Sequence, residues 1–80
     1  MSWPGQFKKF DVRPAVMRGD EPYPAIRKHV DALKPNEGLA IIAPFLPAPL
    51  IEKLGSEGFK SKVERSTDGS WVAYFWRETD

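Results

Sequence analysis

Apolar and polar residues alternate near the start of the chain, and an almost unbroken apolar run stands at its middle. In "KKFDVR", residues 8–13, Phe10 and Val12 are expected to point one way and their polar neighbours the other, as in a half-buried strand. The run "GLAIIAP", residues 38–44, is typical of a strand with neighbours on both sides. The first half of the chain therefore predicts two strands, and the second of them is expected to be central.

Two other segments repeat their apolar residues at helical spacing. The first has Ile26, Val30 and Leu33 on one face, and its helix is expected to end at Lys34, before a proline. The second, "APLIEKLGSEG", residues 48–58, stops at a glycine, the residue type favoured just past a helix C-terminus. Each predicted helix follows one of the two strands.

The last third of the chain predicts a β-hairpin around Thr67-Asp68-Gly69. Two registers are open at this point. A three-residue loop with a left-handed Gly69 pairs Val63 with Ala73, whereas a two-residue turn reverses the faces. We expect the first register, which turns one set of residues toward the helices: Phe59, Val63, Trp71, Ala73 and Phe75. It turns Val72, Tyr74 and Trp76 away from the helices. Lys62 and Glu64 are expected to flank these residues on the same face.

The predicted order β-α-β-α-β-β is that of an α+β fold, a two-layer α/β sandwich. Right-handed parallel crossovers and a closing antiparallel hairpin give a four-stranded mixed sheet of order 1-2-4-3, with both helices on one face. We expect a single domain over residues 8–80, preceded by an irregular arm, residues 1–7. The edge strands carry lysines that oppose edge-to-edge pairing: Lys8, Lys9, Lys60 and Lys62. The expected core comprises nine positions: Phe10, Val12, Ile26, Val30, Leu33, Ile41, Leu50, Leu54 and Val63.

One helix layer leaves the other face of the sheet without a cover. The last strand presents Tyr74 and Trp76 on that face in the expected register. Either the arm folds back over it with Trp3 and Phe7, or a partner protein covers it. The sequence leaves both possibilities open.

Composition narrows the possible functions. The 80 residues include 12 basic and 11 acidic ones, a net charge of +1, and no long basic face that would favour nucleic acid. No apolar run approaches the roughly 20 residues of a membrane span, and the N-terminus lacks the order of a secretory signal. We therefore expect no membrane contact and a cytoplasmic location.

The chain has no cysteine, which excludes disulfides, thiolate metal sites and a persulfide on the protein itself. His29 is the sole histidine, and its place on the first predicted helix favours a solvated or half-buried side chain. No recognisable ligand spacing surrounds it. Neither a metal site nor a cofactor is expected.

Candidate binding residues gather in the loops that follow the first two strands. The carboxyl ends of parallel strands meet at one edge of an open sheet, where ligands usually bind. This edge is expected to collect Arg13, Arg18, Asp20, Glu21, Tyr23 and Phe45. The two adjacent carboxylates also suit the positive end of a helix dipole, which needs no ligand. They lack the burial that would make them an acid and base pair, so no catalytic residue is predicted.

The order of several short motifs resembles the TusA/SirA-like sulfur carriers, small proteins of β-α-β-α-β-β fold. The matching pieces are "DVR", "PYPAI", "LKPNEGLAI", "GF" and the "DG" of the hairpin. Glu21 stands where the resemblance places the sulfur-carrying cysteine. The longer first loop, "PFLPAPL" and Trp71 are more similar to a sister group of uncharacterised bacterial domains. The resemblance implies the fold and not an activity.

These observations favour a non-enzymatic adaptor or accessory module. It is expected to contact a protein partner through the loop edge and the aromatic sheet face, including Tyr74 and Trp76. The alternative is a cysteine-free accessory in sulfur or redox-cofactor transfer. That protein would bind a small anionic ligand at the N-terminus of the first helix.

Overall fold

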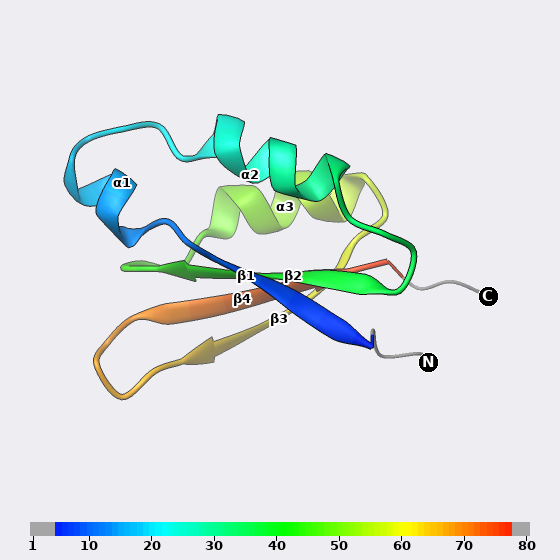
Figure 1. Ribbon diagram of the computed structural model, residues 1–80. Helices are drawn as coiled ribbons and strands as arrows, with labels where there is room; N and C mark the ends of the chain where they lie inside the picture. The colour runs from blue at the N-terminus through cyan, green and yellow to red at the C-terminus, as the bar shows by residue number, and fades with distance from the viewer. Residues whose placement is uncertain (1–4, 78–80) are drawn as a thin grey trace.

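The computed structural model describes residues 5–77, which form a sheet with helices on one face (Figure 1). The strands are β1 (Gln6–Asp11), β2 (Glu37–Ala43), β3 (Lys60–Arg65) and β4 (Trp71–Trp76), in the order β1-β2-β4-β3. β1 and β2 are parallel, and β4 is antiparallel to both β2 and β3. The predicted mixed sheet, its strand order and the central position of β2 are confirmed.

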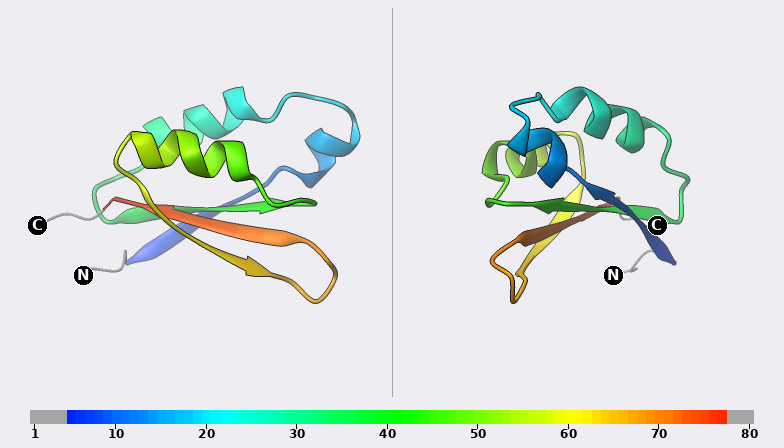
Figure 2. Two further views of the ribbon diagram at one scale, coloured as in Figure 1. Left: turned by 180° about the vertical axis from the view of Figure 1, so that it is seen from behind. Right: turned by 60° about the vertical axis from the view of Figure 1, so that its left-hand side comes forward.

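Three helices accompany the sheet, one more than predicted. α2 (Tyr23–Asp31) and α3 (Ala48–Ser56) lie over the same face, and the short α1 (Arg13–Met17) stands at the end of β1 (Figures 1 and 2). α1 begins where the Asp11 carboxylate accepts a hydrogen bond of 2.9 Å from the Arg13 amide. Pro14 in its first turn has the fixed φ that suits a helix start. None of the helices formed by residues 5–77 is long and apolar enough to cross a membrane.

Three predicted boundaries were wrong, and one of them is the end of β1, which lies at Asp11 rather than Arg13. β1 begins at Gln6 rather than Lys8, so Gln6 and Phe7, assigned to the arm, pair with β2; Trp3 lies outside the described residues. α2 ends at Asp31 rather than Lys34. The chain turns there because the buried Glu37 carboxylate accepts a 2.9 Å hydrogen bond from the Lys34 amide. This local contact between residues three apart holds the loop that leads from α2 to β2.

The core lies between β2, β4 and the two longer helices. Leu39, Ile41, Leu54 and Phe75 are completely buried in it. Eight of the nine predicted core residues belong to this cluster or pack against it. Val63 does not: 37% of it is exposed, because β3 is an edge strand and all six of its residues are exposed.

The three-residue hairpin register is confirmed. Val63 pairs with Ala73, and Gly69 has a φ of 88°, the left-handed conformation that the loop requires. Phe59, Ala73 and Phe75 join the core, whereas Trp71 is half-buried, with the Arg65 guanidinium 5.4 Å from its ring centroid. The alternate residues of β4 lie on the face away from the helices, as predicted: Val72, Tyr74 and Trp76.

Phe7 covers the centre of that open face. Its ring makes edge-on contacts with Tyr74, 5.1 Å between centroids, and with Trp76, 6.3 Å. The ring crosses β2, the strand between β1 and β4, at Gly38, where an added Cβ would overlap the Phe7 ring. Only 5% of Trp76 is exposed. The chain itself therefore supplies a cover for part of the aromatic face, through a residue of β1.

Candidate functional site

A pocket of about 450 Å³ opens at the edge of the sheet where β1 and β2 end. Its floor is formed by core residues, among them Val12, Ile26 and Ile41. The starts of α2 and α3 form its walls. The pocket is thus an extension of the core toward the solvent, at the edge that the sequence predicted for binding.

Prolines build the walls of this pocket. Pro22 precedes α2, Pro47 precedes α3, and Pro49 stands in the first turn of α3; all three line the pocket. A proline is tolerated in a first helical turn, where its missing N–H would have had no partner. Its fixed φ also stiffens the wall. The motifs "EPYP" and "PFLPAP" therefore start two helices and shape the space between them.

Three residues bring polar groups to the pocket: Glu21, Tyr23 and Lys53. The Lys53 ammonium stands 6.0 Å from the centroid of the Tyr23 ring. Glu21 and Tyr23 were predicted at this edge, but Lys53 was missed. The one feature of the sequence that could have indicated Lys53 is its spacing. It follows Leu50 by three residues on α3, and residues at that spacing share a helix face.

Asp20 and Glu21 differ in what they contact. The Glu21 carboxylate lies 3.5 Å from the Tyr23 amide nitrogen, at the start of α2. Asp20 instead accepts a 3.0 Å hydrogen bond from the Arg18 guanidinium, and both side chains of this pair are exposed. Of the two carboxylates, only that of Glu21 faces the helix N-terminus and lines the pocket.

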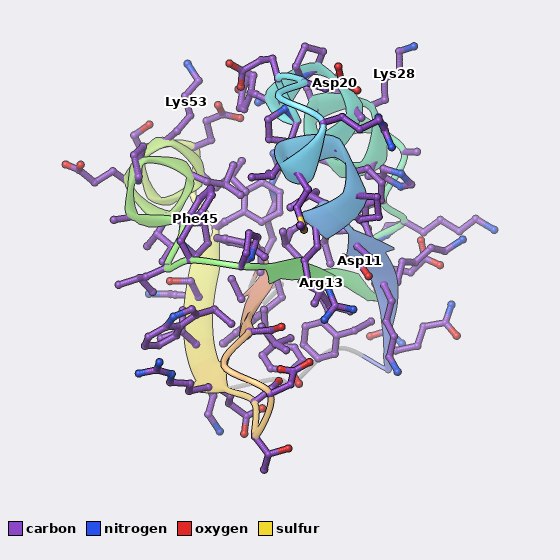
Figure 3. All side chains as sticks on the ribbon, turned by 90° about the vertical axis from the view of Figure 1, so that its left-hand side faces the viewer. Asp11, Arg13, Asp20, Lys28, Phe45 and Lys53 are labelled. Carbon is purple, nitrogen blue, oxygen red and sulfur yellow. The ribbon has the colours of Figure 1, made fainter. Side chains whose placement is uncertain are left out.

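Arg13 lies at the level of the sheet and serves the hairpin rather than the pocket (Figure 3). Its guanidinium donates two nearly parallel hydrogen bonds to Asp11, of 3.0 and 2.8 Å. It also donates to Asp68, at 3.3 Å, and to the Ser70 hydroxyl, at 3.0 Å. The loop-edge group that the sequence predicted is therefore divided, with Arg13 holding the β3–β4 turn to the end of β1.

We expect the Arg13 contacts to add stability that is lost in acid. Hydrogen bonds from Arg13 lower the pKa of Asp11, and hydrogen bonds from Ser70 lower that of Asp68. Carboxyl groups with lowered pKa values stabilise the fold above the ordinary value near 3.8, and this stability disappears as the pH falls below it. In Arg13→Met, the free energy of unfolding measured with urea should fall less between neutral pH and pH 3 than it does in the unsubstituted protein. Equal pH dependence of the two proteins would contradict the assigned contacts.

Exposed apolar side chains stand in the two segments that leave the ends of β1 and β2. Phe45 is 49% exposed and Leu46 42%, both in the loop from β2 to α3, and Met17 at the end of α1 is 82% exposed. Figure 3, which faces this edge, shows Phe45 on the same side as Lys53. Phe45 was predicted here and does not line the pocket itself. Tyr74 and Trp76 lie on the open sheet face instead.

The described part of the chain, residues 5–77, holds no cluster of three or more histidine, cysteine, aspartate or glutamate side chains that could bind a metal ion. His29 is exposed on α2, and its ring lies against Phe10, with 4.2 Å between centroids. It packs on the first strand as a partly stacked surface residue.

Comparison with known proteins identifies one family. A family model described as "Uncharacterized conserved protein (DUF2249)" matches residues 9–77, most of the chain. No curated protein and no solved structure matches the chain. The matched segment includes all the residues that line the pocket and the second half of β1. The chain therefore belongs to the DUF2249 family of uncharacterised conserved proteins.

Proposed function

We propose that this protein is a non-enzymatic adaptor or accessory module that binds a partner protein through the edge where β1 and β2 end. The observation that carries the proposal is an apolar pocket at this edge, together with exposed Met17, Phe45 and Leu46 in the segments that leave β1 and β2. Among the described residues, Val63 is the only other large apolar side chain with comparable exposure. Apolar surface gathered in one place is typical of a contact patch.

The charged groups around the pocket support docking rather than chemistry at this edge. Arg18 and Asp20 pair with each other, and Arg13 is engaged by Asp11 and the hairpin. Charges neutralised within the molecule form a polar border around an apolar centre, the composition of many protein interfaces. The proposed contact is therefore mainly apolar.

The aromatic sheet face has a smaller part in this proposal than the loop edge. Trp76 is buried, and Phe7 lies against both Trp76 and Tyr74. Tyr74 remains half-buried, beside Lys62 and Glu64 of β3. The alternative of a small anionic ligand at the N-terminus of α2 has less support, because the Glu21 carboxylate already lies 3.5 Å from the Tyr23 amide nitrogen at that place.

A relationship to the TusA/SirA-like carriers and a bacterial, cytoplasmic setting are part of the same proposal. The relationship is supported by the order of the sequence motifs and by the strand order of the sheet. A cysteine-free member of such a group would act by contact alone, since it has no thiolate to carry sulfur.

Serine substitutions at the edge test the proposal. In capture experiments from an extract of the source cells, Phe45→Ser combined with Leu46→Ser should lose at least about tenfold of the specific partner signal, as apolar anchors of an interface do. Val63→Ser is the matched control, because Val63 has similar exposure on β3, away from this edge. Circular dichroism checks that all variants are folded. Equal capture by the double variant and the control would refute docking at the edge.

A further inference from the structure

The geometry points to a particular kind of partner segment: one that places an aromatic or long aliphatic side chain in the pocket and a carboxylate beside it, opposite Lys53. This inference rests on the proposed function, because it names the chemistry of the partner at the same edge. Three observations carry it: the size of the pocket, its proline walls, and the Lys53 ammonium, which has no carboxylate partner among residues 5–77.

The pocket has the size and stiffness to take one large side chain. About 450 Å³ is on the order of fifteen water volumes at roughly 30 Å³ each, enough for an aromatic ring and its neighbouring atoms. Pro22, Pro47 and Pro49 have no N–H to donate and a fixed φ. A wall of this kind offers few hydrogen bonds and loses little freedom when a side chain enters. Apolar contact is therefore its main means of recognition.

The mouth of the pocket has one basic group without a carboxylate partner. Among the ion pairs of residues 5–77, Arg13 and Arg18 are each matched with aspartates, while Lys53 occurs in none. Its ammonium is held only by the Tyr23 ring, 6.0 Å away. An exposed contact of this kind is weak, so a carboxylate can replace it at small cost.

The one carboxylate that lines the pocket, that of Glu21, already contacts the start of α2. Glu21 lies 3.5 Å from the Tyr23 amide at the start of α2, where the helix dipole favours a negative charge. An arriving ligand would therefore meet an unmatched positive charge at Lys53 and a partly compensated negative charge at Glu21. This asymmetry favours an acidic partner segment over a basic one.

Three small probes with the same apolar body and different ends test the inference: 3-phenylpropionate, its neutral amide and 3-phenylpropylamine. Each is titrated into the full chain, and binding is followed by the amide chemical shifts of residues that line the pocket, including Tyr23, Leu50 and Lys53. The carboxylate should bind about three- to fivefold more tightly than the amide, the range for one exposed ion pair. The amine should bind no better than the amide.

Two lysine variants assign the preference to one residue. Lys53→Met keeps the length and apolar stem of the side chain and should abolish the preference for the carboxylate. Lys28→Met is the matched control, because Lys28 is exposed on α2 and does not line the pocket (Figure 3). Its preference should equal that of the unsubstituted protein. Tighter binding of the amine, or a carboxylate preference that persists in Lys53→Met, would overturn the inference.

A peptide probe separates a partner segment from a free small molecule. Acetyl-Glu-Phe-Glu-amide should bind at the same residues at least about tenfold more tightly than 3-phenylpropionate, because a segment also contacts the exposed Phe45 and Leu46. Equal or weaker binding of the peptide would overturn the protein-segment assignment. Failure of all four probes to shift the pocket amides, with partner capture still sensitive to Phe45→Ser and Leu46→Ser, would reject this inference and leave the proposed function standing.

Discussion

Replacing Leu54 by alanine is expected to lower the free energy of unfolding by about 3 to 4 kcal/mol, within the range of roughly 2 to 5 kcal/mol for truncating a buried leucine. Leu54 has no exposed surface and anchors α3 in the core. Alanine would leave a cavity between the helix and the sheet. A chain of 80 residues has a total stability of only about 4 to 12 kcal/mol, so the loss is a large part of it.

Urea unfolding followed by far-ultraviolet circular dichroism measures this effect. Leu46→Ala is the matched control, since the same side chain at 42% exposure leaves no cavity when it is shortened. It should change stability by less than about 0.5 kcal/mol. A loss below about 1 kcal/mol in Leu54→Ala would show that α3 does not pack on the sheet through this residue.

Replacing Gly38 by alanine is expected to cost about 2 to 3 kcal/mol, although it adds only one methyl group. The new Cβ would overlap the Phe7 ring and stand 2.8 Å from the carbonyl oxygen of Phe75 on β4. The ring can move only by giving up its contacts with Tyr74 and Trp76. The carbonyl oxygen belongs to the backbone of the neighbouring strand and yields even less.

A second substitution and a control isolate the cause. Phe7→Leu should lower the free energy of unfolding less in the Gly38→Ala variant than in the unsubstituted protein, because the smaller side chain removes part of the overlap. Gly55→Ala adds the same methyl group on α3, where nothing lies within 4 Å. It should stabilise the protein by about 0.5 to 1 kcal/mol through helix propensity. If Gly38→Ala is as harmless as Gly55→Ala, Phe7 does not cross the sheet at this position.

Several features could be predicted because they depend on local chemistry. The left-handed Gly69 determines the hairpin loop, and the loop determines which β4 residues face the helices. The short α1 was not predicted, because five residues are too few to show a helical period. It forms where Pro14 and the Asp11 carboxylate act together, and the Asp11 side chain is held in turn by Arg13.

The candidate site was predicted in position but not in composition. Loops that follow parallel strands meet at one edge, so Glu21, Tyr23 and Phe45 could be assigned to it from their places in the chain. Lys53 could not, because its distance from Tyr23 depends on how α3 packs beside α2. Arg13 was expected in the same group but does not line the pocket, since the folded chain brings Asp68 and Ser70 within reach of its guanidinium.

The sequence by itself determined the fold class, the strand order, the hairpin register and the lack of any thiol chemistry. These follow from local periods, from turn chemistry and from composition, which do not depend on distant contacts. Only the tertiary structure decided that Val63 is exposed, that Phe7 reaches Trp76 across Gly38, and which side chains line the pocket. Each of these depends on residues far apart in the chain, and their packing is the sum of many small contacts that no single segment encodes.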